Sequence, residues 1–297
     1  MRKQFRDTTV DLLSKDERLV VLLGDIGVYG FFEALKQYPD RIHNIGILEQ
    51  ASIGVAAGMA LTGMIPVFHS IAPFVVERAY EFLKLDFGYQ RLGGNFVSVG
   101  ASNDYTALGP THHCPADVAL LQQIPPMEII VPGTAKEFDN LFRDTYANGN
   151  PTYFRLSEQV NSRSQDVVFG DLLQLTSGNG LTIIAVGPML HHVESAIASI
   201  KAKPDCTLLY CTTVKPFDCN MVLPFSRSNK ILIVEPFNRG TLLFDVMRNF
   251  EGISVLVESI GVPHTFTNSY GSLEEQNDKY GLSVKSISEK IERMINA

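Results

Sequence analysis

The stretch that decides the fold is "RIHNIGILEQASIGVAAGMALTGMIPVF", residues 41–68. Its pattern predicts a strand that ends at Gly46, a helix that begins near Glu49 and a second strand that begins at Met64. This order is typical of a βαβ unit, in which the two strands are parallel. Glu49 is a carboxylate in a run of otherwise apolar and very small residues, so its role needs an explanation.

The same rhythm extends outward in both directions along the chain. Besides the strand at 64–70, β-branched runs predict strands in two series, at 18–25, 94–101, 127–133 and 151–157, and again at 181–188, 206–218, 229–236 and 254–266. Helices are expected at 189–202 and 239–250 and over the charge-patterned end of the chain. A polar, turn-rich segment separates the two series at 158–180. We therefore expect two consecutive three-layer α/β domains, at 1–160 and 181–297, joined by a linker at 161–180.

Composition excludes several classes of partner. The chain has 297 residues, 45% of them hydrophobic, and a net charge of −7 with no basic block, so neither nucleic acid nor a membrane surface is expected as a partner. No segment has the pattern of a signal peptide or a membrane span, which predicts a cytoplasmic protein. The cysteines lack metal-ligand spacing, and we interpret them as reduced, buried hydrophobes. They are Cys114, Cys206, Cys211 and Cys219.

Glu49 is expected to be enclosed. Gly54 and Gly58 lie four residues apart on one face of the predicted helix, which would allow another backbone to approach closely. A helix N-terminus favours a carboxylate by about 0.3 to 1 kcal/mol, whereas full burial disfavours the charged form by roughly 4 to 7 kcal/mol. Burial should therefore leave a carboxylic acid that can donate a hydrogen bond. The alternative from this stretch alone is a helix-start glutamate that faces solvent.

Several blocks resemble the C-terminal half of transketolases and, slightly less, of deoxyxylulose-phosphate synthases. They are "PDRIHNIGILEQASIGVAAGMALTGMIPVF", "ERAYEFL", "LGPTHHCPADVALLQQIPPMEIIVPG", "VGPMLHHVESAI", "TTVKPFD", "ILIVEP" and "YGLSVKSI". The resemblance implies a thiamine pyrimidine-binding domain followed by a transketolase C-terminal domain. It implies thiamine diphosphate as cofactor and a two-carbon ketol transfer between sugars as activity. The family's invariant glutamate falls on Glu49.

The resemblance also assigns roles to residues near this glutamate. In the family the glutamate hydrogen-bonds N1′ of the aminopyrimidine and so activates the cofactor. Phe74 matches an aromatic residue that stacks on the aminopyrimidine, although most buried phenylalanines simply belong to a core. His112, in "GPTHH", matches a histidine that contacts substrate hydroxyls and can move protons near neutral pH. His113 is expected to point elsewhere and to be structural.

Further candidates for the substrate side have alternative interpretations. Arg2, followed by Lys3, matches a basic pair whose arginine binds a substrate phosphate, but a solvated role at a chain end is equally possible. His69 lies at the end of a predicted strand. Asp25 lies at a strand C-terminus, where ligands often approach an α/β sheet, or it caps a helix.

The diphosphate-anchoring motif of the family, "GDG…N", is absent from the chain. "GDIG" at 24–27 has no asparagine at the right distance, because Asn44 comes too early. No metal site is expected in this chain, and Mg²⁺ or Ca²⁺ would be bound by a separate N-terminal transketolase subunit. We expect a split transketolase, with this chain forming a homodimer within an α₂β₂ assembly. The alternatives are the beta subunit of a thiamine-dependent 2-oxoacid dehydrogenase, a deoxyxylulose-phosphate-synthase-like enzyme, or a non-catalytic scaffold or regulator.

Two departures from the family pattern bear on the substrate. Leu108 takes the place of the aspartate that reads a sugar hydroxyl, and Glu158 takes the place of an arginine that binds the substrate phosphate. Arg155, three residues earlier, could compensate if its strand directs it towards the site. We therefore expect an unusual sugar substrate rather than the common pentose phosphates.

Overall fold

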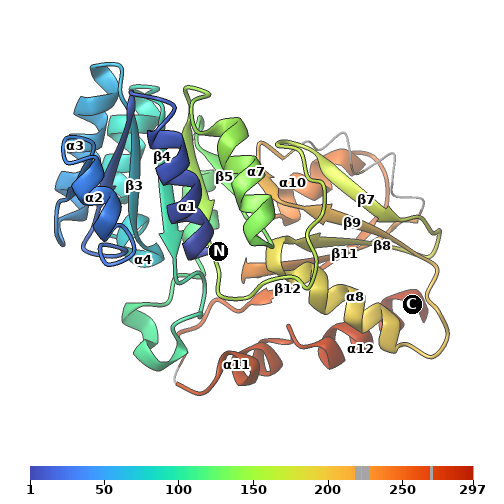
Figure 1. Cartoon of the computed structure of the whole chain (residues 1–297). Coiled ribbons are helices and arrows are strands. Elements are labelled where there is room, and N and C mark those ends of the chain that lie inside the picture. The colour runs from blue at the N-terminus through green and yellow to red at the C-terminus, as the bar shows by residue number, and fades with distance from the viewer. Residues whose placement is uncertain (218–221, 223–227, 268–269, 297) are drawn as a thin grey trace.

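The computed structural model describes residues 1–217, 222, 228–267 and 270–296. Its strands form a seven-stranded sheet with the order β10-β5-β6-β4-β3-β1-β2 and a five-stranded sheet with the order β12-β11-β8-β9-β7. Helices cover both sheets, and the N-terminus lies near the junction between the two halves (Figure 1). The predicted fold class, two α/β units in sequence, is confirmed.

The strand bounds follow the predicted runs closely. The strands of the first sheet are β1 (Leu19–Leu23), β2 (Ile42–Asn44), β3 (Ile65–Ile71), β4 (Gly94–Val99), β5 (Glu128–Ile130), β6 (Pro151–Arg155) and β10 (Thr213–Lys215). Those of the second sheet are β7 (Leu172–Thr176), β8 (Leu181–Val186), β9 (Cys206–Cys211), β11 (Lys230–Asn238) and β12 (Leu256–Val262). All pairings are parallel except those of β10 with β5 and of β7 with β9.

Helices connect these strands. The first half contains α1 (Arg2–Leu13), α2 (Phe32–Gln37), α3 (Glu49–Leu61), α4 (Ala72–Val75), α5 (Tyr80–Phe82), a π-helix (Leu83–Tyr89), a 3₁₀-helix (Thr106–Thr111), α6 (Asp117–Gln122) and α7 (Ala135–Thr145). The second half contains α8 (Leu190–Ser199) after a 3₁₀ turn (Gly187–Met189), α10 (Leu243–Met247) before another (Arg248–Phe250), α11 (Leu273–Tyr280) and α12 (Val284–Asn296).

Two strands differ from the sequence expectation. The run 206–218 was expected as one strand, but β9 ends at Cys211 and β10 joins the first sheet, antiparallel to β5. Val131 N–H donates to Thr212 O at 2.7 Å, which fixes the point where the chain changes sheets. Within the range 161–180, expected as a linker, Leu172–Thr176 form β7 and pair with β9. Residues 218 and 219, the latter the fourth cysteine, lie outside the described residues.

A buried glutamate joins the two halves. Glu137, near the start of α7, accepts hydrogen bonds from Gly133 N–H at 2.8 Å and from the Tyr210 hydroxyl of β9 at 2.8 Å. A Cβ atom on Gly133 would lie 2.3 Å from the Tyr210 hydroxyl, so only glycine fits here. The halves are thus locked together by specific polar contacts and by close backbone approach.

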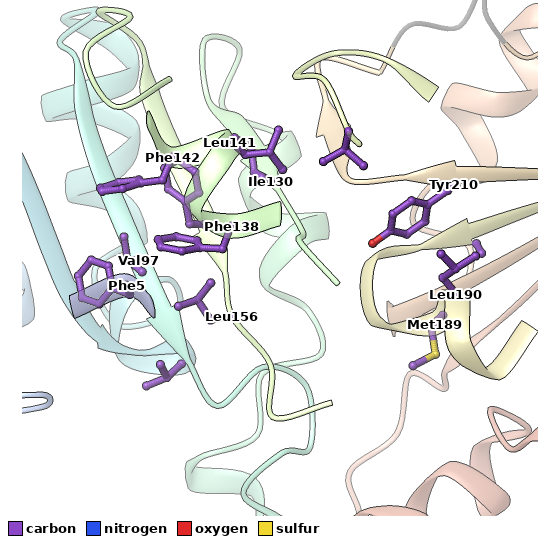
Figure 2. Close-up of a cluster of buried hydrophobic side chains, with 14 of the residues drawn as sticks. Phe5, Val97, Ile130, Phe138, Leu141, Phe142, Leu156, Met189, Leu190 and Tyr210 are labelled. Atoms are coloured by element: carbon purple, nitrogen blue, oxygen red, sulfur yellow. The ribbon is translucent and has the colours of Figure 1, made fainter. Parts of the chain in front are cut away.

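Apolar side chains fill the space between α1, α7 and the first sheet. Phe5 of α1 meets Phe138 and Phe142 of α7 edge-on, at ring-centre distances of 6.1 and 6.3 Å. Figure 2 shows this cluster and, across the junction, Met189, Leu190 and Tyr210 of the second half. The described cysteines, Cys114, Cys206 and Cys211, are free and buried, as expected.

The sheet topology gathers the candidate residues at one edge. Asp25 follows the carboxyl end of β1, Phe74 that of β3 and His112 that of β4. The carboxyl ends of the strands are where α/β sheets commonly bind ligands. The expected backbone approach on α3 is not seen within this chain: Gly58 is exposed, and a Cβ atom there would have no neighbour within 4 Å. Gly54, on the same face, is half-buried beside Asp86 of the π-helix, so only the Gly58 part of this face is open.

Candidate active site

Glu49 is enclosed at the start of α3, and its prediction as a buried carboxylate is confirmed. The side chain is 1% exposed, and its Oε2 accepts a hydrogen bond from Arg78 Nη1 at 2.8 Å. Its Oε1 is buried and has no hydrogen-bond partner among the described residues. Because buried carboxylate oxygens are normally satisfied, this atom is the one available to a ligand.

Arg78 changes the electrostatics expected at this position. The expectation of a neutral acid rested on burial alone, but the structure places a cationic guanidinium 2.8 Å from Glu49 Oε2. The buried carboxyl therefore has a charged partner that the sequence did not reveal. Arg78 has no predicted role beyond its place in "ERAYEFL". Its position four residues after Phe74 is the one local feature that could have indicated a contact between the two side chains.

Phe74 and His112 lie next to this ion pair. The Arg78 guanidinium carbon lies 4.1 Å from the centre of the Phe74 ring, a cation–π contact. The same ring meets the imidazole of His112 edge-on at 5.3 Å. The structure thus brings Glu49, Phe74 and His112 together through Arg78, although they come from three separate segments of the chain.

The loop that carries His112 depends on one glycine. Gly109 has φ of 73°, and a Cβ atom there would lie 2.3 Å from the ring of Tyr270. His112 is half-buried, with its Nδ1 2.9 Å from the Thr111 hydroxyl. His113 is buried and contacts Tyr105 O at 3.2 Å through Nε2, and burial lowers its pKa. These contacts favour the structural interpretation of His113.

A pocket of about 480 Å³ lies beside α1 and the turn after β1. Its lining includes Arg2, Lys3, Arg6, Asp25 and His69. His69 is fully buried, and burial lowers its pKa to about 4, so the ring is neutral at pH 7. Its Nδ1 lies 2.8 Å from Val97 O, which assigns the proton to Nδ1 and leaves Nε2 as an acceptor without a partner among the described residues.

Asp25 does not cap a helix. Its Oδ1 accepts from Asn44 Nδ2 at 3.1 Å, and its own N–H donates to Asn44 Oδ1 at 3.0 Å. This reciprocal pair fixes an exposed turn in which Asp25 has φ of 62°. Asp25 thus shapes the rim of the pocket that contains Arg2.

Arg155 is a correction to the candidate list. Its side chain is 1% exposed, and its Nε donates to Asp117 Oδ2 at 2.7 Å while its Nη2 donates to Ser102 Oγ at 2.6 Å. Side chains alternate between the two faces of β6, and the Arg155 side chain lies on a face that is buried in the interior. The buried carboxylate of Asp117 compensates its charge there. It is therefore not available to bind a substrate phosphate.

Asp104 is a buried carboxyl that the sequence did not single out. It accepts hydrogen bonds from Ser157 Oγ at 2.9 Å and from Glu158 N–H at 3.0 Å, and so ties the loop after β4 to the end of β6. Burial raises its pKa from 3.8 to about 7, although these hydrogen bonds oppose the shift. Asp104 therefore holds its proton in the folded state over a range of pH in which the unfolded chain releases it.

Replacement of Asp104 by asparagine should make stability less sensitive to pH. In the wild type, Asp104 contributes to the free energy of unfolding because its pKa is higher in the folded state than in the unfolded state. This contribution is fully present below about pH 4 and is lost as pH rises through about 7. The free energy of unfolding of D104N relative to wild type should therefore increase by about 1 to 3 kcal/mol between pH 5 and pH 8. Urea unfolding at both pH values measures this.

Glu235, whose pKa is also raised to about 7 by burial, titrates in both proteins, so it cancels in the comparison. The exposed Asp171, replaced by asparagine, is the matched control and should show no such change. Equal differences for D104N at pH 5 and pH 8 would contradict the assignment.

Neither a metal centre nor a membrane span is found in the part of the chain that the structure describes. No group of three or more His, Cys, Asp or Glu side chains within it could hold a metal ion. No helix among the described residues is long and apolar enough to cross a bilayer.

Comparison with known proteins agrees with this geometry. Residues 1–162 match the model of the transketolase pyrimidine binding domain, and residues 170–287 match that of the transketolase C-terminal domain. A protein of Rhodococcoides fascians described as an uncharacterized 33.6 kDa protein in the fasciation locus is 35% identical, over 97% of this chain and 92% of its own length.

Two further proteins extend the comparison. One of the subunits of the apulose-4-phosphate transketolase of Phocaeicola vulgatus is 28% identical, over 96% of this chain and 94% of its own length. A solved structure described as a split gene transketolase, inactive beta4 tetramer, superposes with a TM-score of 0.86 at 24% identity, over 99% of this chain and 97% of that one. Both family models and a curated relative at 35% identity cover nearly the whole chain. The chain therefore belongs to the transketolase family.

Proposed function

We propose that this chain is the C-terminal subunit of a split transketolase, which transfers a two-carbon ketol unit between sugars through thiamine diphosphate. The observation that carries the proposal is Oε1 of Glu49, a buried carboxylate oxygen with no partner among the described residues. The cofactor of the transketolase family presents a ring nitrogen to a carboxyl group of this kind. The relative from Phocaeicola vulgatus, named as a transketolase subunit and similar over nearly its full length, supports the split arrangement.

The residues present fit the aminopyrimidine end of the cofactor. Glu49 would hold the ring nitrogen through Oε1, while Arg78 keeps the other oxygen in place. Phe74 supplies an aromatic face beside them, and His112 would hold or release a proton at the substrate side. When bound, thiamine diphosphate supplies the nucleophilic carbon and stores the electron pair during transfer.

A partner would complete the site. Diphosphate is normally held with a divalent metal, and the described residues offer no ligand group for one. We therefore propose that an N-terminal subunit binds Mg²⁺ or Ca²⁺ and the diphosphate.

Exposed apolar side chains around α3 support a homodimer contact at this helix within an α₂β₂ assembly: Ile47, Leu48, Val55 and Leu61. The cytoplasmic location stays a prediction.

A deoxyxylulose-phosphate-synthase-like activity is less well supported, because that enzyme also has a phosphate-binding arginine at the position that Glu158 occupies here. The beta subunit of a 2-oxoacid dehydrogenase would share the buried glutamate, but the "GPTH" histidine is typical of transketolases and favours that function instead. A scaffold without activity would have no reason to keep an unpartnered buried carboxylate oxygen. Assay of the reconstituted pair with ketoses, aldoses and 2-oxoacids distinguishes these functions. Ketol transfer supports the proposal, and oxidative decarboxylation alone would reject it.

The substrate is proposed to be an unusual sugar. Leu108, in the 3₁₀-helix Thr106–Thr111, is 52% exposed and can accept no hydrogen bond from a sugar hydroxyl. Glu158 is exposed and negative, and Arg155 is buried against Asp117, so neither would bind a phosphate. Arg2, Lys3 and Arg6 line the pocket beside α1. We propose that an anionic group on the substrate binds there.

The reconstituted pair should use the common pentose phosphates poorly. Specificity constants for xylulose 5-phosphate with ribose 5-phosphate should fall below about 10⁴ M⁻¹s⁻¹, the lower end for ordinary enzymes. Steady-state kinetics with deoxygenated, branched and differently charged sugars tests this. Glu158→Arg should raise the constant for phosphorylated acceptors, and Glu17→Arg, at an exposed turn before β1, is its control. Housekeeping rates with the wild-type pair would contradict the substrate proposal.

A further inference from the structure

A separate pocket lies in the second half of the chain, between β12 and α12. It has a volume of about 260 Å³. Its walls come from the end of β11, the middle of β12, the α11–α12 turn and one face of α12. The lining residues are Arg239, Ser259, Ile260, Tyr280, Gly281, Ser286, Glu289, Lys290 and Arg293. None of them belongs to the candidate active site of the first sheet.

Positive charge converges on this pocket. Lys290 pairs with Glu258 of β12. Arg239 and Arg293 have no ion pair and no side-chain hydrogen bond among the described residues. Burial, and then the charges of Arg293 and Arg239, lower the pKa of Lys290, in keeping with the place of all three cations in one lining. Glu289 is the one carboxylate in the lining, and Glu258 offsets Lys290 from outside it, so the excess positive charge of the pocket comes from the two arginines.

Arg239 and Arg293 are exposed, so water solvates their guanidinium groups and their N–H donors are open to a ligand. Like charges held close together repel, and mobile side chains would separate unless the fold kept them together. Arg239 is held by its backbone, whose N–H donates to Val262 O at 2.8 Å, next to Gly261. A Cβ atom on Gly261 would lie 2.9 Å from the Arg239 Cα, so the close approach requires glycine. The backbone thus fixes the position of Arg239 beside β12.

We propose that this pocket binds the phosphate group of a small phosphate monoester. Two guanidinium groups offer several N–H donors in the planar arrangement that matches a tetrahedral oxyanion. Lys290, although paired with Glu258, has further N–H donors, and Ser286 adds a hydroxyl. The ring of Tyr280 and the side chain of Ile260 give the organic part of the ligand an apolar surface, while Glu289 accepts hydrogen bonds from ligand hydroxyls.

The site does not depend on the proposed ketol transfer. Its residues come from β12, α11, α12, the α11–α12 turn and the position directly after β11, and they include none of Glu49, Phe74 and His112. Its effect on the chain would be to link α12 to β12 and so to stabilise the second half. A phosphate monoester bound there acts as a regulator or stabiliser, not as a substrate.

Calorimetric titration of the full chain with glycerol 1-phosphate, at constant ionic strength, tests the proposal. The dissociation constant should rise at least tenfold in Arg239→Gln and in Arg293→Gln. Lys285→Gln is the matched control, because Lys285 is exposed on the same helix but does not line the pocket. Glu289→Gln should tighten binding severalfold, since it removes a negative charge while leaving the cations unchanged.

The same titration with inorganic phosphate and with glycerol separates the contributions of the anion and of the organic part. Phosphate should bind and glycerol should not. Loss of affinity in K285Q equal to that in R293Q would show a diffuse surface charge and overturn the proposal. Binding unchanged in R239Q and R293Q would show that the ligand binds elsewhere on the chain and would overturn it as well. Circular dichroism confirms that each variant is folded.

Discussion

Ketol-transfer activity of the reconstituted pair should fall by about 10² to 10⁴-fold when Glu49 is replaced by glutamine, as expected for loss of a positioned acid–base group. The amide is nearly isosteric and can still accept the hydrogen bond from Arg78, but it cannot exchange a proton with the cofactor ring through Oε1. Thermal stability should change little. Initial rates with saturating cofactor, together with a melting curve, measure both effects.

The control is Glu17→Gln, since Glu17 is exposed at the turn before β1, at the opposite end of that strand from the candidate active site. It should keep wild-type activity. A Glu49→Gln variant that retains more than about a tenth of the rate, a difference of only about 1.4 kcal/mol in the barrier, would show that Glu49 is not the activating residue.

The isolated chain should show no detectable ketol transfer, and addition of the N-terminal subunit should restore it. The described residues provide a glutamate and an aromatic ring for the aminopyrimidine but no ligand group for the metal that anchors the diphosphate. Calorimetry with thiamine diphosphate and Mg²⁺ should therefore show weak binding to the isolated chain and at least tenfold tighter binding to the pair.

Each subunit assayed alone with cofactor, Mg²⁺ and substrates is the necessary control. Chromatography with light scattering shows whether the chain is folded and oligomeric before the partner is added, so that an unfolded sample is not mistaken for an incomplete site. Full turnover by the purified chain alone would contradict the split-site proposal.

The sequence by itself determined the elements and their order. Alternation of β-branched runs with helical segments predicted β1, β3, β4, β6 and β8 to within a few residues, because parallel strands are buried on both faces and have a strong compositional signal. The small residues around Glu49 also predicted its burial, since a helix lined by alanine and glycine lies close to its neighbours.

Only the tertiary structure decided which charges meet. The pairing of Glu49 with Arg78 and the burial of Arg155 against Asp117 depend on how separate segments pack, so local pattern gave Arg78 no role and left Arg155 as a phosphate ligand. The transfer of β10 to the first sheet is a further example, because a strand of Thr213–Lys215 is too short to show which sheet it will join. Hydrophobic periodicity acts over a few residues, whereas charge compensation in a low-dielectric interior is decided by contacts between residues far apart in the chain.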